Sequence, residues 1–183
     1  ITNVMEEYTP DMDQMLFYLP LAGSTFKKTY YDETLGRAVS RFVPAENLVV
    51  PYETSDLETC PNITQVVRMS LNDLRKRQLS GVYLDVDVIP AQKEVTGVTS
   101  ELDGIQGIEP STVDYDCTIL EVHVDLDLEG YEEVDDEGEP TGIKVPYIVT
   151  ISEDNGQILA IRRNYLEDDP LKKKIQYFTH YKF

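Results

Sequence analysis

The chain has 183 residues, of which 41% are hydrophobic and 27% charged, a composition typical of a globular protein with its own core. Its 16 basic and 34 acidic side chains give a formal net charge of −18 at pH 7, which argues against wrapping nucleic acid by neutralising its phosphates. No stretch has the length and apolar character of a membrane span or a secretory leader, so we expect no membrane partner.

The first predicted element is a helix that begins at residues 9–11, Thr-Pro-Asp. Thr9 can cap its first turn, and the proline and the aspartate both suit a helix start. Four apolar residues then recur at helical spacing, which predicts a face packed on the core: Met12, Met15, Leu16 and Leu19. We expect Pro20 and Gly23 to end the helix.

A period of two replaces the helical period after this point. Residues 25–32 and 37–43 predict a hairpin around Glu-Thr-Leu-Gly at 33–36. Further strands are predicted at 46–52 and 63–69, where prolines bound the alternating runs.

A second helix is predicted from Ser70, because Ser-Leu-Asn-Asp at 70–73 resembles a capping box. We expect Leu71 and Leu74 to face inward and Gly81 to follow the helix end. The three basic residues at 75–77 point in different directions near the negative end of the helix dipole. They predict a solvated face in place of a phosphate site.

Residues 85–116 have no clear period, since glycines and prolines interrupt them, and are the candidate excursion from the main body. Four apolar residues there fit a short amphipathic helix: Val95, Val98, Leu102 and Ile105. Alternation resumes at 117–128, and three further strands follow, with a tight turn at Asp-Asn-Gly 154–156: 143–152, 157–163 and 175–183. The chain is therefore predicted to be a single α+β fragment, 1–183, with a mostly antiparallel sheet.

Residues 125–139, DLDLEGYEEVDDEGE, hold nine carboxylates, so half of the net charge lies in this run. Five residues match the calcium loop of an EF-hand at its positions 1, 3, 5, 6 and 12: Asp125, Asp127, Glu129, Gly130 and Asp136. Three features oppose calcium binding. The last ligand is the shorter Asp, Glu132 stands where the loop is normally apolar, and the flanks are strands.

Strand geometry adds a distance argument against calcium. Cα atoms of Asp125 and Asp127 on a straight strand would lie about 7 Å apart, whereas calcium needs oxygens about 2.3–2.6 Å from one centre. We therefore predict a flexible, solvated acidic connection at 129–142. The alternative function is a calcium-stabilised β-rich binding module that uses the acidic loop 125–136.

Other chemistry is sparse in the sequence. His123 and His180 both fall in alternating strands, and ordinary strand positions are the favoured interpretation. The sequence has none of the common phosphate-loop, hydrolase or zinc motifs, so we predict no catalytic, cofactor or metal residue and no enzymatic activity. A hydrolase with two opposed carboxylates in a pocket remains a third reading. Cys60 and Cys117 are predicted to be free thiols in a reducing compartment.

Several long stretches resemble portal proteins of short-tailed double-stranded-DNA bacteriophages and their prophages. They are DMDQMLFYLPLAGSTFKKTYYDETLGRAVSRFVPAENLVVPY, DLETCPNITQVVRMSLNDLRK, HVDLDLEGYE, GIKVPYIVTI and AIRRNYLEDDPLKKKIQYFTHYKF. The last resembles the stretch that precedes the family's helical stem. The resemblance covers nearly the entire chain and is more specific than any short motif above.

The resemblance implies a structural subunit of a head-to-tail connector. Portals form a dodecameric ring at one capsid vertex of the virion, through which DNA is packaged and ejected without sequence-specific binding. They assemble in the host bacterial cytoplasm with terminase, scaffolding or capsid protein and tail factors. This chain would correspond mainly to the wing region and lack the stem and clip that contact terminase and tail. The missing initiator Met and the apolar ending also lead us to expect a fragment of a longer protein.

Overall fold

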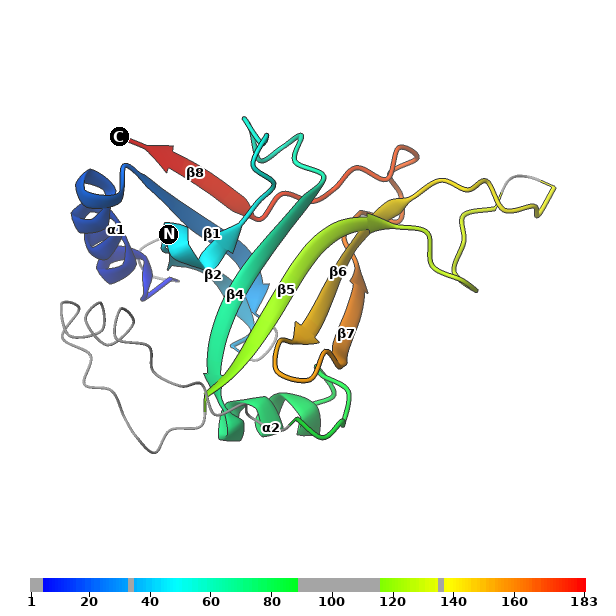
Figure 1. Cartoon of the computed structure of the whole chain (residues 1–183), viewed down its shortest axis with the longest axis horizontal. Helices are drawn as coiled ribbons and strands as arrows, with labels where there is room; N and C mark the ends of the chain where they lie inside the picture. The colour runs from blue at the N-terminus through cyan, green and yellow to red at the C-terminus, as the bar shows by residue number, and fades with distance from the viewer. Residues whose placement is uncertain (1–4, 33–34, 89–115, 135–136) are drawn as a thin grey trace. The chain divides into compact units, whose positions relative to one another are not determined.

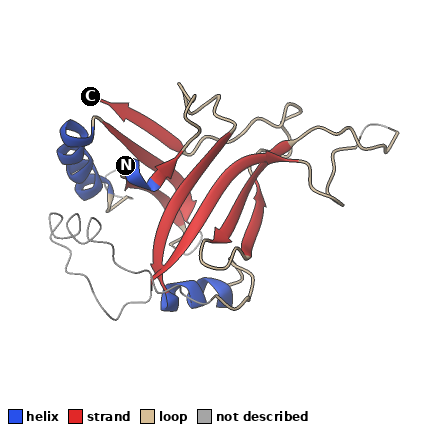
Figure 2. Ribbon diagram, in the orientation of Figure 1, coloured by secondary structure: helices blue, strands red, loops and turns tan. Residues whose placement is uncertain are grey.

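The computed structural model describes residues 5–32, 35–88, 116–134 and 137–183 (Figure 1). They form two α-helices and two antiparallel sheets and are mostly strand, which confirms the predicted α+β class (Figure 2). The chain divides into two compact units, each described here by itself. Unit 1 comprises Ile1–Val66, Glu121–Ile148 and Arg162–Phe183, and unit 2 comprises Val67–Leu120 and Val149–Ile161. Most of the predicted excursion at 85–116, with its short helix, lies outside the described residues.

The two sheets have the strand orders β2-β1-β8 and β3-β4-β5-β6-β7. In chain order the elements are α1 (Tyr8–Ala22), β1 (Ser24–Asp32), β2 (Arg37–Val43), a short 3-10 helix (Ala45–Asn47), β3 (Leu48–Val49), β4 (Asn62–Ser70), α2 (Leu71–Leu79), β5 (Asp116–Leu126), β6 (Val145–Ser152), β7 (Ile158–Arg163) and β8 (Phe178–Lys182).

The first helix begins earlier than predicted and continues through Pro20, whereas its predicted end at Gly23 is confirmed. It begins at Tyr8 with Glu7 as the N-cap residue, so the expected cap at Thr9 is wrong. Pro20 lies inside the helix, and the helix ends at Gly23, whose φ of 71° gives the left-handed turn that glycine adopts without strain. The apolar stripe is only partly confirmed. Met15 is buried, but Leu16 is 55% exposed, since the helix lies against the β1–β2 hairpin along a narrow face.

Two carboxylates of the first helix region cover the free edge of β2. Glu7 Oε1 accepts the backbone N–H of Ser40 at 3.1 Å, and Asp11 Oδ2 accepts that of Phe42 at 3.0 Å. Arg37 Nη1 also donates to Glu7 Oε2 at 2.7 Å. Burial raises the pKa of Glu7, but hydrogen bonds from its own backbone, Arg37 and Ser40 outweigh this and lower the pKa to about 2. Outward N–H groups of an edge strand thereby find acceptors within the same chain.

The predicted hairpin is confirmed, with β1 and β2 paired from Phe26↔Val43 to Asp32↔Arg37. The strand predicted at 46–52 is wrong for most of its length. Residues 45–47 form a turn of 3-10 helix, and only Leu48 and Val49 pair with β4. Prolines at 44 and 51 bracket this stretch and leave no room for a longer ladder.

The second helix follows its capping signal. Ser70 Oγ accepts the backbone N–H of Asp73 at 3.2 Å and donates to the carboxylate of Asp73 at 3.0 Å. Gly81, with φ 75°, follows the helix end. Leu74 is buried as predicted, whereas Leu71 is 39% exposed because it occupies the first turn, outside the packed face.

Each unit has its own apolar cluster. The cluster of unit 1 gathers residues from both sheets and the loop after β3: Phe26, Val43, Leu48, Leu57, Cys60, Ile63 and Phe178. The cluster of unit 2 packs α2 against strands: Met69, Leu74, Cys117, Ile119 and Leu159. Both cysteines are buried free thiols, as predicted.

The cap at Ser70 generates a first prediction. Ser70→Ala removes the acceptor of the Asp73 N–H and should lower the free energy of unfolding by about 1 kcal/mol in urea denaturation. Asn72→Ala, at a neighbouring exposed helix position, is the matched control and should leave stability unchanged or slightly raised. Equal losses in both variants would contradict the capping role.

Candidate functional site

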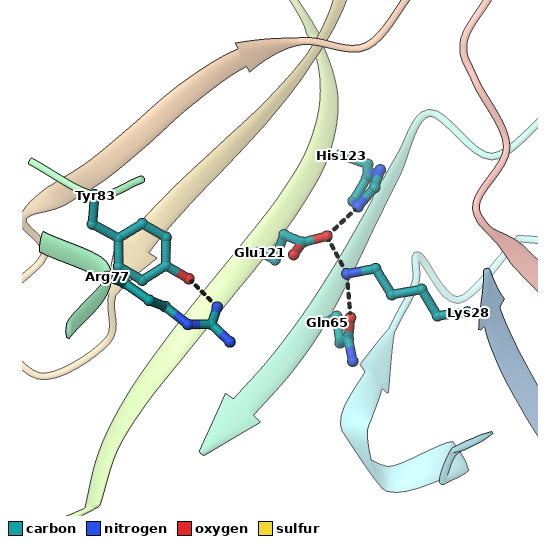
Figure 3. A network of polar contacts seen from close by, with 6 residues as sticks. All are labelled: Lys28, Gln65, Arg77, Tyr83, Glu121 and His123. Carbon is teal, nitrogen blue, oxygen red and sulfur yellow. Dashed lines mark hydrogen bonds and ion pairs between the residues drawn. The ribbon is translucent and has the colours of Figure 1, made fainter. Parts of the chain in front are cut away.

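A partly buried polar network in unit 1 joins the two sheets (Figure 3). Lys28 Nζ on β1 donates to Gln65 Oε1 on β4 at 2.9 Å and to Glu121 Oε1 on β5 at 2.6 Å. His123 Nε2 lies 2.8 Å from the same Glu121 oxygen. These four residues are called the Lys28–Glu121 network below.

Strand alternation explains how an adjacent pair of lysines is divided between two environments. Successive side chains of β1 point to opposite faces of its sheet. Lys27 is buried against the first helix, with its Nζ 3.7 Å from the centroid of the Tyr8 ring. Lys28 is buried on the other face, where its Nζ lies 5.5 Å from the centroid of the Phe178 ring. Two adjacent lysines in a strand with one solvent-exposed face give no sequence signal of burial. The burial of Lys27 and Lys28 was therefore not predicted from the sequence.

The electrostatics of the network depend on Glu121. Burial raises the pKa of this carboxyl, but the hydrogen bond from His123 and the positive charge of Lys28 outweigh burial and bring the pKa to about 2. Burial, reinforced by the negative Glu121, raises the pKa of Tyr177 above its usual range. With a pKa of about 2, the Glu121 carboxylate stays ionised at neutral and mildly acidic pH.

The geometry fits a structural use of these charges better than catalysis. His123 is 3% exposed, and its ring packs edge-on against Tyr177 and Phe178 at centroid distances of 5.6 and 5.3 Å. A base must reach the proton that it abstracts. A cavity of about 310 Å³ lies beside β8, but its lining includes neither His123 nor the other three network residues.

The second predicted histidine has different partners. His180 stacks on Phe26 with ring centroids 4.6 Å apart, and its Nε2 lies 2.6 Å from Ser24 Oγ. Burial lowers the pKa of His180, and the nearby positive Lys182 lowers it further. Each histidine thus sits in a strand with its own partner, as the sequence interpretation favoured.

The basic residues of α2 are all exposed, as predicted, and have local partners. Arg77 donates to the Tyr83 hydroxyl at 3.1 Å, a contact within unit 2 that Figure 3 also draws. Lys76 pairs with Asp73 at 3.3 Å, and Arg75 pairs with Asp85. These contacts lie on the surface, where each ion pair contributes little stability.

The acidic connection makes contacts within itself and one ion pair with another part of unit 1. Val134 pairs with Pro140 in an isolated bridge, Glu132 accepts the Gly130 N–H at 2.8 Å, and Glu133 forms an ion pair with Lys172. Two strand boundaries differ from those predicted by the alternation. Strand β5 ends at Leu126, two residues before its predicted end, and the last strand begins at Phe178 in place of residue 175.

The calcium ligands proposed from the sequence are not brought together where the structure describes them. Asp125 and Asp127 are exposed, and Asp136 lies outside the described residues. Over residues 5–32, 35–88, 116–134 and 137–183, no three His, Cys, Asp or Glu side chains are placed to share a metal ion. In the same residues, neither helix has the length and apolar surface to cross a membrane.

No protein-family model matches the chain, and no curated protein matches it significantly. The resemblance to portal proteins therefore stays a prediction from the stretches quoted above.

The network generates a second prediction. Glu121→Gln leaves Lys28 buried without its counter-charge and should lower the free energy of unfolding by about 2–4 kcal/mol, near the range for one-sided loss of a buried pair. The wild-type contribution of Glu121 is present above its ordinary pKa of 4.5 and is lost as pH falls towards about 2. Between pH 4.5 and about 2, the free energy of unfolding should therefore depend less on pH in the variant than in the wild type. Urea denaturation at several pH values measures this difference.

Glu129→Gln, which neutralises an exposed carboxylate of the acidic connection, is the control for this experiment. It should leave both stability and the acid slope as in the wild type. A Glu121→Gln variant that unfolds like the control would show that the network contributes nothing.

Calcium supplies a third prediction. Asp125 and Asp127 are both exposed, so we expect no calcium site there. The thermal midpoint should therefore be unchanged in about 2 mM calcium, a concentration that saturates the calcium sites of many extracellular modules. Differential scanning fluorimetry with calcium, magnesium and chelator makes the comparison. A midpoint that rises with calcium alone, and no longer rises in Asp125→Asn, would restore the calcium module as the function.

Proposed function

We propose that this chain is a wing-region part of the portal ring of a short-tailed double-stranded-DNA bacteriophage or prophage, with a structural role. The observation that carries the proposal is the resemblance of five long stretches, which between them include parts of both units. It implies a subunit through whose ring DNA is packaged into the capsid and later ejected.

The physical properties of the chain support this role. A net charge of −18 repels the DNA backbone, which suits a component of a conduit that DNA must pass without adhering. The Lys28–Glu121 network joins two sheets through charged hydrogen bonds, which suits a structural role. Terminase, scaffolding protein and tail factors would be bound through other regions of the complete protein, so no residue here is assigned to them.

The assembly state of the complete protein tests the proposal. Protein expressed from the whole gene should form closed rings in negative-stain electron microscopy, with a mass by light scattering that is a whole multiple of the subunit mass. The 183-residue chain alone serves as the comparison and is expected to assemble less completely. A complete protein that stays monomeric across concentrations, with and without its scaffolding protein, would rule the portal role out.

A further inference from the structure

The cavity beside β8 lies between two segments that are far apart in the sequence. One wall is the loop between β3 and β4, with Asp56 and Glu58, and the other is β8, with His180 and Lys182. Both walls belong to unit 1. Sites for small molecules have volumes of about 300–1,000 Å³. At about 310 Å³ this cavity is at the lower end of that range, so it suits a small ligand.

Both walls of the cavity are anchored in the same apolar cluster. Leu57 of the loop and Phe178 of β8 are buried in the cluster of unit 1, and both also line the cavity. Lys174 Nζ donates to the Cys60 carbonyl at 2.8 Å, which ties the end of the loop to the segment that leads into β8. The cavity is therefore formed before a ligand arrives, and little binding free energy is lost to ordering of the protein.

Three charged side chains of the lining have no partner in the described part of the chain. Asp56 and Glu58 are exposed and Lys182 is half-buried, and none of them forms an ion pair or a side-chain hydrogen bond with a described residue. His180 adds no charge at neutral pH, because burial and the nearby Lys182 hold its pKa below the ordinary value of 6.5. The lining therefore carries two negative charges and one positive charge.

The balance of these charges limits the class of ligand. An anion would meet two carboxylates, and no three His, Cys, Asp or Glu side chains in the described ranges are placed to share a metal ion. A neutral amino acid would leave one carboxylate without a partner, and a diamine would leave Lys182 without one. A basic amino acid has two cationic groups and one carboxylate, so it complements all three charged side chains.

We propose that this cavity binds a free basic amino acid, arginine or lysine. The carboxylate of the ligand meets Lys182, its two cationic groups meet Asp56 and Glu58, and its methylene chain lies against Leu57 and Phe178. A guanidinium forms two parallel hydrogen bonds with a carboxylate, so arginine binds more tightly than lysine. Because the ligand contacts the loop and β8 together, its binding stabilises the outer strand of the three-stranded sheet. This site does not depend on the proposed portal role.

Isothermal titration calorimetry of the full chain with L-arginine tests the site, because three analogues each remove one charge. Citrulline has a neutral side chain, agmatine lacks the carboxylate, and Nα-acetylarginine lacks the α-ammonium group, as an arginine within a peptide does. Each analogue loses one charged hydrogen bond and should bind about tenfold more weakly than arginine, or weaker still. Nα-acetylarginine that binds as tightly as arginine would show that the site takes a peptide, and would overturn the free amino acid as the ligand.

Variants of the lining locate the binding site. Glu58→Gln should weaken arginine binding about tenfold. Lys182→Met should abolish the preference for arginine over agmatine, since the carboxylate then has no partner. Glu129→Gln, at an exposed carboxylate outside the cavity, is the matched control and should bind arginine as the wild type does. Circular dichroism checks that each variant folds. Should Lys182→Met fail to fold, the exposed Glu58→Gln and the analogue series decide.

Three results would overturn the proposed site. The first is the absence of arginine binding at millimolar concentration. The second is agmatine or citrulline binding as tightly as arginine. The third is an equal loss of affinity in Glu58→Gln and Glu129→Gln, which would show a general attraction of cations to an acidic chain. None of these results bears on the portal role, which the assembly of rings tests separately.

Discussion

Glu121 accepts hydrogen bonds from a buried lysine and a buried histidine, and the packing of unit 1 depends on this carboxylate. Lys28 belongs to the three-stranded sheet and Glu121 to the five-stranded one, so a charged hydrogen bond sets the approach of the two sheets. Apolar side chains such as Phe178 fill the space beside it. Apolar contacts are non-directional and tolerate sliding, whereas a buried cation must meet its partner at hydrogen-bond distance. The network therefore supplies register that the core alone does not.

The acidic character of the chain has structural uses beyond repulsion. Glu7 and Asp11 act as acceptors for strand N–H groups, Glu121 neutralises a buried lysine, and Glu133 binds Lys172. Hydrogen bonds hold the pKa of Glu7 and that of Glu121 at about 2, so these two carboxylates stay ionised even in mild acid. From the sequence, no structural partner was assigned to any of these four residues, and only Glu133 lies in the acidic connection that was predicted to be solvated, 129–142. Asp125, just before that connection, is exposed.

Local sequence patterns predicted the helices and strands well, but they did not predict which of these elements contact one another. The hairpin, the helix from Ser70 and most strands follow from alternation, turn chemistry and capping, which act over a few residues. The Lys28–Glu121 network was missed because Lys28 and Glu121 are 93 residues apart and nothing local marks a buried lysine. The helix predicted to bury Leu16 was misjudged for a related reason. The spacing of apolar residues identifies the apolar face of the helix. How much of that face is buried depends on the surface of the β1–β2 hairpin against which the helix packs. No catalytic, cofactor or metal residue was predicted from the sequence.

The pairing of β1 with β8 also has a consequence for synthesis on the ribosome. Ser24 contacts His180 across 156 residues of chain, and Phe178 completes the apolar cluster that begins with Phe26. The amino-terminal hairpin therefore emerges long before the strand that finishes its sheet. While the intervening residues are translated, the nascent hairpin carries an unpaired flank and an incomplete core. Such long-range closure slows folding and exposes apolar surface, so this chain should engage chaperones during translation for longer than a protein of equal size built from local contacts.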